Sequence, residues 1–385
     1  METVYDSKNT CTGCSACFVV CPFGAIQMLA DQKGFSYPVI QQNKCQNCGK
    51  CKTVCQACHS NITTCNYKQA YFVAMHKDKQ VLMHSQSGGM FSAISDIILD
   101  KGGIVYGCIY DPKQHKAIHT RATTKEVRDE MRGSKYIQSD LNSTFIMVRD
   151  DLLKGNYVCF SGTPCQNDGL KRFLKVMKTP DERLFTIDII CHGVPSPLLW
   201  KEHVKYLERK YKGTVEKAVF RDKSFGWISH KESVWIHGHK HSGEKFKHLF
   251  YSNSCLRPSC YQCAYAQLIR HTDFTIGDAW KRIRGTETGG TKGQSLLIIN
   301  SEKANQILPE IEKRAHIQKV DIDQFMQPNL HRSSVSKDDP EAFWISYQRF
   351  GYPYLLFVFG EQHLLNKGYK IIRRTLLKLW RHRSI

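Results

Sequence analysis

Apolar and polar positions alternate regularly from about residue 68 onward. Runs rich in Val, Ile, Tyr and Phe predict five strands, at 71–76, 81–85, 104–110, 157–160 and 184–190. Residues 77–79 are expected to form the turn between the first two strands. Stretches with helical periodicity predict three helices, at 85–103 after a short loop, at about 166–176 and at about 197–210. Strands that alternate with helices indicate an α/β domain with a largely parallel sheet.

The first 68 residues have a different pattern, in which cysteine loops replace the apolar runs. Two segments share the spacing C-x2-C-x2-C-x3-C, and their eight cysteines are Cys11, Cys14, Cys17 and Cys21, then Cys45, Cys48, Cys51 and Cys55. In this spacing three thiolates bind one [4Fe-4S] cluster and the fourth binds its neighbour. The repeat therefore predicts two [4Fe-4S] clusters, one on Cys11, Cys14, Cys17 and Cys55 and one on Cys45, Cys48, Cys51 and Cys21.

This segment resembles the bacterial two-cluster ferredoxins, of which the run CPFGAI at 21–26 is typical, so an α+β ferredoxin-like domain is expected over residues 1–68. Zinc usually takes two separated pairs of Cys or His, and disulfides are rare in the cytosol, so both alternatives fit this spacing less well. One position departs from the pattern, because Gln56 follows Cys55 where these ferredoxins usually have Pro. Cys58 is consequently a rival to Cys55 as a ligand.

Later cysteines follow two of the predicted strands. Cys165 and Cys191 lie in the turns SGTPC and CHGVP, which are expected at the carboxyl edge of the sheet, where such folds bind ligands. Cys260 and Cys263 have C-x2-C spacing, so these four thiols are candidates for a third [4Fe-4S] cluster. The competing interpretation is that each is an ordinary buried cysteine, which fits Cys108, Cys159 and Cys255 better.

A cofactor phosphate is a second candidate ligand of this domain. Ser87, Gly88 and Gly89 open the helix at 85–103, and a helix N-terminus preceded by adjacent glycines suits the pyrophosphate of a flavin, although an ordinary helix cap explains the same residues. Lys135 is a candidate contact of an anionic reduced flavin or else a solvated lysine. His192, beside Cys191, is a candidate proton donor, with a structural histidine as the alternative.

The charge is strongly positive, with 55 Lys and Arg against 35 Asp and Glu and a formal net charge of +20. Three clusters on twelve thiolates would leave roughly +14. Residues 362–385 carry seven Lys or Arg and no acidic residue, and 369–380 read as a basic amphipathic helix. A tail over 346–385 is therefore expected to dock on a membrane surface or a protein, or to pack on its own domain. The polar N-terminus and the absence of an apolar run of ~18 residues favour the cytoplasm, with the inner membrane surface as an alternative site.

Seven motifs in a fixed order resemble the coenzyme F-420 hydrogenase/dehydrogenase beta-subunit family over about residues 70–300. They are SQSGGMFSAI, RGSKYIQSD, FSGTPCQNDGLKRFL, DIICHGVPSP, the RDKSFGW run, SCYQCAYA and DFTIGDAW. The resemblance implies an internal [4Fe-4S] cluster on Cys165, Cys191, Cys260 and Cys263. It also implies FAD beside Ser87, Gly88 and Gly89, with Lys135 as a flavin or substrate contact. The run GDAWKRIRG departs from the usual GDFWG of the family, which leaves the substrate open.

These features predict an iron–sulfur flavoprotein oxidoreductase, with a ferredoxin domain at 1–68 and a flavin- and cluster-binding domain at 69–345. It would pass electrons between clusters and FAD for hydride transfer with an unidentified small organic substrate, with a link to polysaccharide synthesis as one setting. An electron carrier such as ferredoxin is the expected protein partner. The alternatives are a non-catalytic electron-transfer subunit and, more remotely, a zinc or nucleic-acid-binding protein, which the scattered basic residues disfavour.

Overall fold

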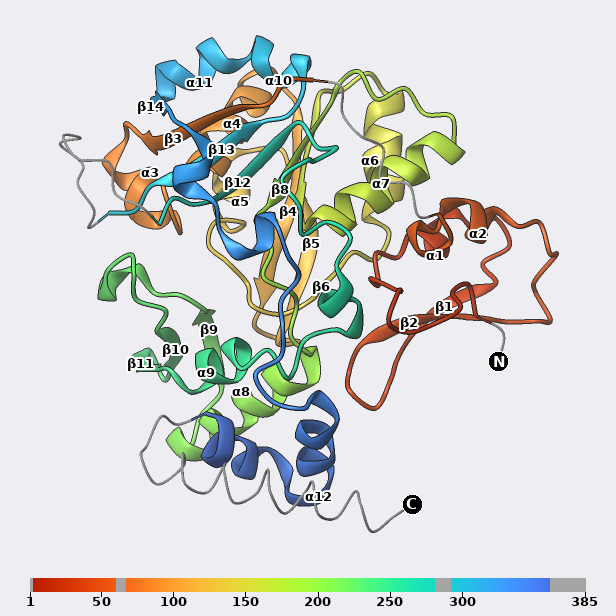
Figure 1. Cartoon of the computed structure of the whole chain (residues 1–385), viewed down its shortest axis with the longest axis vertical. Coiled ribbons are helices and arrows are strands. Elements are labelled where there is room, and N and C mark those ends of the chain that lie inside the picture. Colours follow the sequence, from red (N-terminus) through yellow and green to blue (C-terminus); the bar gives the residue numbers. More distant parts are fainter. Residues whose placement is uncertain (1–2, 60–66, 281–291, 361–385) are drawn as a thin grey trace.

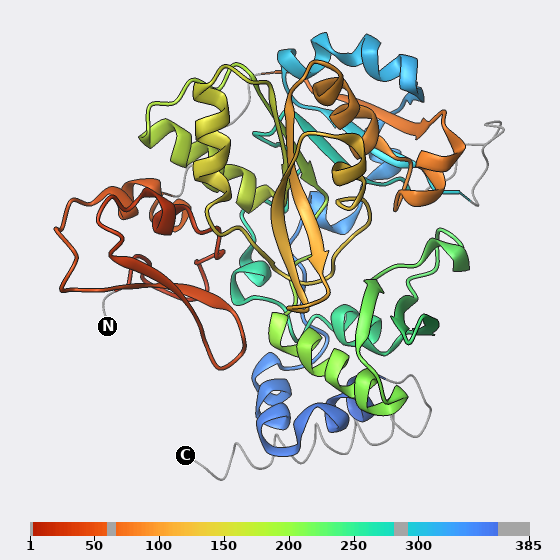
Figure 2. The same cartoon turned by 180° about the vertical axis from the view of Figure 1, so that it is seen from behind.

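The structure is a computed structural model that describes residues 3–59, 67–280 and 292–360 (Figure 1). A small N-terminal module contains the antiparallel pair β1 (Ile26–Ala30) and β2 (Ser36–Ile40) with the short helices α1 (Ala16–Val20) and α2 (Lys50–Val54). The module lies beside α6 (Thr144–Leu153) and α7 (Pro164–Val176), and seen from behind it occupies the opposite side of the picture (Figure 2). Apolar residues of the module and of these two helices share one core, so the module is fastened to the larger domain.

A nine-stranded sheet forms the centre of the larger domain. Its order is β14 (Ala315–Lys319), β3 (Ala70–His76), β13 (Ser295–Ile299), β12 (Phe274–Asp278), β8 (Leu184–Ile189), β7 (Val158–Gly162), β4 (Ile104–Asp111), β5 (Lys116–Ala122) and β6 (Ser139–Asp140). The central strands β12, β8, β7 and β4 are parallel, which confirms the predicted α/β domain. Antiparallel partners flank this centre, because β13, β3 and β14 pair antiparallel on one side and β5 pairs antiparallel with β4 on the other.

Helices cover both faces of this sheet, and the alternation of side chains along β4 shows why. Val105 faces α4 (Met90–Asp100) and α11 (Leu308–Arg314), whereas its neighbours Ile104 and Tyr106 face α6 and α7. All three residues are buried, as expected for a strand with helices on both sides. Short helices complete this part of the chain, namely α3 (Lys79–His84), α5 (Lys125–Asp129) and α10 (Glu302–Gln306).

The predicted strand at 81–85 is wrong, because these residues belong to α3 and the turn after it. The Asp78 side chain accepts hydrogen bonds from the backbone N–H groups of Gln80 and Val81, at 2.7 and 3.3 Å. This is the geometry of a helix N-cap, and it offsets the strand preference of the short apolar run that follows. The other four predicted strands and the three predicted helices are present, with small differences at their ends.

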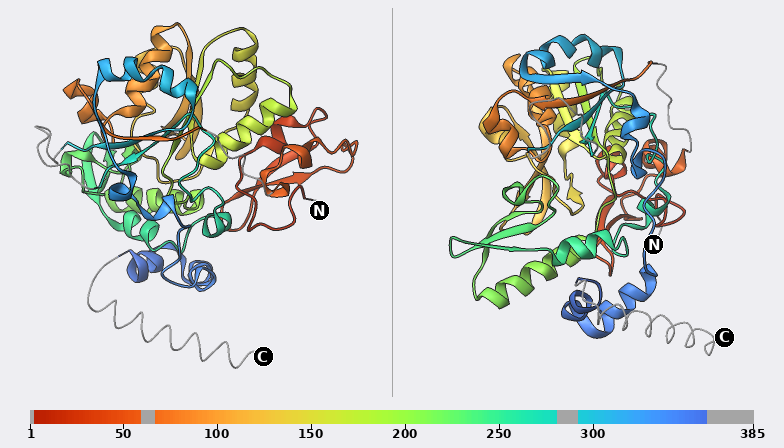
Figure 3. Two further views of the ribbon diagram at one scale, coloured as in Figure 1. Left: turned by 45° about the horizontal axis from the view of Figure 1, so that its top comes forward. Right: turned by 60° about the vertical axis from the view of Figure 1, so that its left-hand side comes forward.

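A further lobe lies on the carboxyl-edge side of the sheet (Figures 1 and 3). It contains the three strands β9 (Val215–Val219), β10 (Glu232–Ile236) and β11 (His239–Gly243), with α8 (Pro197–Tyr211), α9 (Lys245–Tyr251) and α12 (Pro340–Phe359). Gly351, with φ +74°, marks a kink within α12. Tyr352 and Leu355 of this helix are buried with α8, so the second half of α12 packs on the core of the lobe. The remainder of the predicted tail, 361–385, lies outside the described residues. Among the residues that are described, no helix is long and apolar enough to cross a membrane.

Candidate functional site

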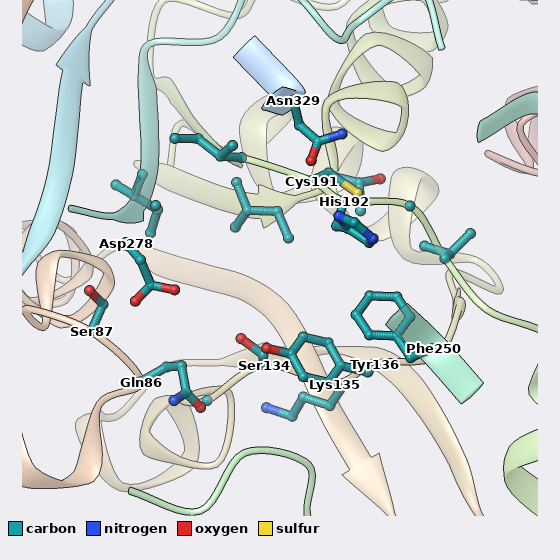
Figure 4. Close-up of a pocket in the computed structure, with 18 of the residues that line it drawn as sticks. Gln86, Ser87, Ser134, Lys135, Tyr136, Cys191, His192, Phe250, Asp278 and Asn329 are labelled. Carbon is teal, nitrogen blue, oxygen red and sulfur yellow. The ribbon is translucent and has the colours of Figure 1, made fainter. Parts of the chain in front are cut away.

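A cavity of about 1100 Å³ opens where several strands of the main sheet end. The turns after β7 and β8 line it with Thr163 and with residues 191–195, and Asp278 contributes from the end of β12. The segments at 85–91 and 131–137 close one wall, and α9 closes another (Figure 4). The carboxyl edge of a parallel sheet is where such folds place ligands, as the sequence predicts.

Four cysteines of the N-terminal module, called here the inner set, surround a small gap. A space of about 20 Å³ is lined by Cys11, Cys14, Cys17 and Cys55 together. Burial raises the pKa of the Cys17 thiol well above its ordinary value, and negative charge on Cys14 and Cys11 raises it further. The rival Cys58 is exposed and its thiol donates to the carbonyl of Val4 at 3.4 Å, so the geometry favours Cys55.

The other four cysteines of the module are called the outer set and are Cys21, Cys45, Cys48 and Cys51. Burial raises the pKa of Cys51, and the charges of Cys21 and Cys45 raise it further. Cys48 is exposed on the same loop. The grouping follows the crossed pattern in the sequence, in which Cys21 joins the second run and Cys55 joins the first.

A third group, the internal set, consists of Cys165, Cys191, Cys260 and Cys263. Cys165 lies in the first turn of α7, Cys191 follows β8, and the last two lie in and just after the 3₁₀ helix η3 (Pro258–Gln262). Burial raises the pKa of Cys191 to about 12, with further increases from the charges of Cys260 and Cys263. Cys191 also lines the cavity (Figure 4).

The three cysteine sets have the donor chemistry that iron–sulfur clusters require. No three His, Cys, Asp or Glu side chains in residues 3–59, 67–280 and 292–360 are placed to hold one metal ion. A single zinc ion draws its ligands to about 2.0–2.3 Å from one centre, whereas a four-iron cluster binds each thiolate through a different iron and keeps the thiols further apart. Each set supplies four thiols, the number that a four-iron cluster binds.

The inner and internal sets meet at α7. A Cβ added at Gly169 of this helix would lie 3.0 Å from the Sγ of Cys14, so the backbone of α7 approaches the inner set closely. Burial raises the pKa of Cys165, and the charge of Cys14 is among the further causes, which places the two sulfurs near each other.

Gln56 joins the two sets through hydrogen bonds. Its side-chain N–H donates to Thr12 Oγ1 at 2.6 Å and to the carbonyl of Cys165 at 3.2 Å. Its Oε1 accepts from the hydroxyl of Tyr265, which also lies 2.6 Å from Asp168 Oδ2 on α7. A proline at position 56 has no side-chain amide, so the departure from the ferredoxin pattern corresponds to a bridge between the module and the larger domain.

The predicted phosphate loop lies at the cavity, and some of its polar groups already form hydrogen bonds within the protein. Ser87 lines the cavity and its hydroxyl donates to the carbonyl of Gln294, while the Gly88 N–H donates to Ser295 Oγ at 2.9 Å. A Cβ at Gly88 would lie 2.2 Å from the carbonyl oxygen of Ala74, so close contact with β3 requires glycine here. Gly89, with φ +82°, is the N-cap of α4, whose first N–H groups remain at the cavity wall.

Lys135 reaches the cavity, but its ammonium group is held by backbone carbonyls. The Nζ atom donates to Glu130, Met131 and Arg132 at 2.9–3.1 Å. Burial lowers the pKa of Lys135 to about 8, so the side chain changes its charge near the upper end of the physiological range.

His192 also lines the cavity, where Nε2 lies 2.6 Å from Asn253 Oδ1 and the ring contacts Phe250. An amide oxygen only accepts, so Nε2 carries the proton, and burial lowers the pKa of the ring. This arrangement favours the structural interpretation of His192 over the proton-donor interpretation.

Sequence reasoning assigned no role to the aromatic wall of the cavity. Trp280 stacks on Trp227 with ring centroids 5.6 Å apart and remains about half exposed. Asp278 accepts from Trp227 Nε1 at 2.8 Å and from Arg221 at 2.6 Å, so its charge is balanced. These residues come from the RDKSFGW and DFTIGDAW runs, which contribute to the family resemblance but in which the sequence predicts no site residue.

Comparison with known proteins supports both halves of this arrangement. Residues 155–324 match the model that describes the C terminus of the beta subunit of coenzyme F420 hydrogenase/dehydrogenase, and residues 10–59 match the 4Fe-4S dicluster domain. The second match favours iron–sulfur clusters over zinc in the module.

Two known proteins resemble the chain over much of its length. The chain is 22% identical over 342 residues to the coenzyme F420-dependent sulfite reductase of Methanocaldococcus jannaschii, an alignment that covers 86% of this chain and 50% of that protein. The chain therefore spans about half the length of this curated relative. A chain in a solved structure of the F420-reducing [NiFe] hydrogenase complex from Methanosarcina barkeri is similar at 18% identity. The match covers 65% of this chain and 81% of that chain, with a TM-score of 0.46.

Proposed function

We propose that this iron–sulfur oxidoreductase-type chain is a flavoprotein, because residues 155–324 match the coenzyme F420 hydrogenase/dehydrogenase beta-subunit family and follow a 4Fe-4S dicluster domain. It would pass electrons between three [4Fe-4S] clusters and FAD, which exchanges hydride with an organic substrate. The observation that carries the proposal is the continuous order of cysteine sets. The outer set reaches the surface, the inner set contacts α7, and the internal set borders the cavity through Cys191.

The chain's own residues would hold these groups in fixed positions. The inner, outer and internal sets supply four thiolates each, and the clusters, when bound, supply one-electron transfer. The four cysteines of the internal set are partly buried, and the bridge from Gln56 to Tyr265 and Asp168 would keep the module against α7. Short and fixed spacing between the sets is what electron transfer requires of the protein.

The cavity supports the flavin part of the proposal. Its volume of about 1100 Å³ lies just above the ~300–1,000 Å³ typical of small-molecule sites, so it has room for a large cofactor. The free N–H groups at the start of α4 would bind a phosphate, and Met90 and Phe91 from the same turn line the wall. Lys135 would place positive charge near the anionic ring of a reduced flavin.

The test is anaerobic reconstitution of the full chain, followed by iron, sulfide and flavin analysis. Three clusters predict about twelve iron atoms per chain, and fewer than about eight would contradict even the two clusters of the module. Bound FAD is expected at about one per chain. A chain that holds iron but no flavin would refute the proposal that it is a flavoprotein and would still be consistent with an iron–sulfur electron-transfer subunit. Cys191→Ser should lose about four iron atoms, whereas Cys255→Ser, a buried cysteine outside the three sets, should lose none.

A non-catalytic electron-transfer subunit is the second candidate. The observation that favours it is that the similarity covers only half of the sulfite reductase, so the activity of that protein need not reside in the matched half. Turnover by the isolated chain with reduced methyl viologen as donor separates the two candidates. Reduced clusters without turnover across electron acceptors would favour the subunit.

A further inference from the structure

The two cysteine sets of the N-terminal module differ in their access to solvent. Cys11 and Cys17 of the inner set are buried, and Cys14 lies against α7. In the outer set Cys48 is exposed, and so are its neighbours from Gln46 to Lys50. The outer set is therefore the part of the module that another molecule can approach.

Positive charge surrounds this exposed edge. Lys44 precedes one cysteine of the outer set, and Lys50 and Lys52 flank another, and all three lysines are exposed. None of the three forms a salt bridge within the described parts of the chain, and the sequence contains no Asp or Glu between Asp31 and Asp78. The three lysines outweigh the net charge of about −2 that an oxidised cluster core of about +2 and its four thiolates would carry, so the edge stays positive.

An apolar side chain lies next to the same cysteines. Phe23 follows Cys21 by two residues and is 47% exposed, although it is a large aromatic residue. Pro22 and Gly24 beside it are also exposed. An aromatic residue among charged ones is typical of the small, weakly bound interfaces of electron-transfer proteins.

We infer that this surface, called the outer patch and made of Pro22, Phe23, Lys44, Cys48, Lys50 and Lys52, docks a small electron-carrier protein with an acidic face. The inference rests on the proposed function, because the outer set must hold a cluster. One electron leaves the reduced iron–sulfur centre of the carrier and enters the cluster on the outer set, and no proton or atom is exchanged. Opposite charges bring the two proteins together, and Phe23 supplies the apolar contact.

The experiment uses the reconstituted full chain and an acidic two-[4Fe-4S] ferredoxin as the probe. Binding of the oxidised ferredoxin is measured by calorimetry, and reduction of the chain by reduced ferredoxin is followed by stopped-flow absorbance. The triple variant Lys44→Glu, Lys50→Glu, Lys52→Glu should lower the association rate at low salt by at least about tenfold and weaken binding in parallel. Binding to the wild-type chain should weaken as salt rises, because the interaction is screened.

Two controls separate this inference from the proposed function. Reduced methyl viologen, a small cation, should reduce the variant at least as fast as the wild type, and failure to reduce either chain would count against the clusters themselves. Exchange of three exposed lysines elsewhere, Lys79→Glu, Lys113→Glu and Lys319→Glu, should leave ferredoxin binding within about twofold. Should the glutamate variant lose iron, Phe23→Ser with its lysines intact provides the second test. Unchanged ferredoxin binding and rate in a variant that retains its iron would overturn the docking surface.

Discussion

The hydroxyl of Tyr265 connects the N-terminal module to the larger domain, and its removal has a calculable effect. It donates to Gln56 of the module and lies 2.6 Å from the carboxylate of Asp168 on α7. Burial raises the pKa of Tyr265, and the charge of Asp168 raises it further, so the hydroxyl stays protonated as a donor at every physiological pH. Tyr265→Phe keeps the ring and removes only this donor.

The magnitude follows from the two acceptors. A hydrogen bond to a charged group contributes ~1.5–3 kcal/mol, and an acceptor left buried without a donor has a comparable cost. Because one proton serves both oxygens, these contributions overlap, and we expect the local free energy of opening at the junction to fall by about 2–3 kcal/mol. At about 1.4 kcal/mol per factor of ten, this corresponds to exchange about 30- to 150-fold faster.

Hydrogen exchange with mass spectrometry on the full chain measures this opening directly, because exchange protection reports local stability. Peptides over residues 12–20 and 50–59 should exchange faster in Tyr265→Phe, and peptides from β7 and β8 should not change. Tyr71→Phe is the matched control, because its hydroxyl donates to Gln69 at 2.9 Å and lies away from the junction. The reasoning would be refuted by unchanged exchange in the module, or by the same acceleration in the control.

Three further predictions concern α7 and the cavity. Gly169→Ala should lower the iron retained by the module, because the added Cβ would press on Cys14. Helix propensity alone would stabilise the variant by up to ~1 kcal/mol. A variant that is more stable and keeps all its iron would therefore refute the expected clash with Cys14. Lys223→Met should weaken FAD binding at least about tenfold in a fluorescence titration. The Lys223 ammonium group donates to the carbonyl of Leu82 in α3 and to two carbonyls of the loop before α4, at 2.6–3.0 Å, and so holds that loop in place. FAD affinity should fall as pH rises through about 8, where Lys135 loses its charge, and Lys135→Gln should flatten that dependence; an identical pH profile in both proteins would exclude this lysine.

The sequence predicts features whose physical cause is local. The cysteine spacings define the inner and outer sets because three thiols within one loop cannot lie far apart. The turns with Cys165 and Cys191 were expected at one sheet edge, and β7 and β8 are indeed neighbours whose parallel register sets Val158 opposite Leu184. The family resemblance, expected over about 70–300, is borne out for the part that lies within the matched residues 155–324.

Features that depend on distant segments could not be predicted in this way. The antiparallel position of β13 between β3 and β12 follows from packing across the sheet, and no property of the run Ser295–Ile299 announces it. The same holds for the cavity wall, where Trp227 and Trp280 stack although 53 positions separate their numbers in the chain. Short segments are also hard to predict. The six residues of α3 form a helix rather than a strand because the Asp78 side chain caps it.

The position of Gln56 links the local pattern to the larger assembly. In an isolated two-cluster ferredoxin, a proline after the last cysteine stiffens the turn and needs no partner, because the module has no neighbour on that side. Here the same position faces α7, and a side chain that donates to Thr12 and to the Cys165 carbonyl at once fixes the inner set relative to the internal set. Burial on this side and exposure of Cys48 on the other give the module one face against its own domain and one face open to solvent. Loss of turn rigidity at Gln56 is thus offset by a contact that only a fused module can make, which argues that the module and the larger domain act as one unit.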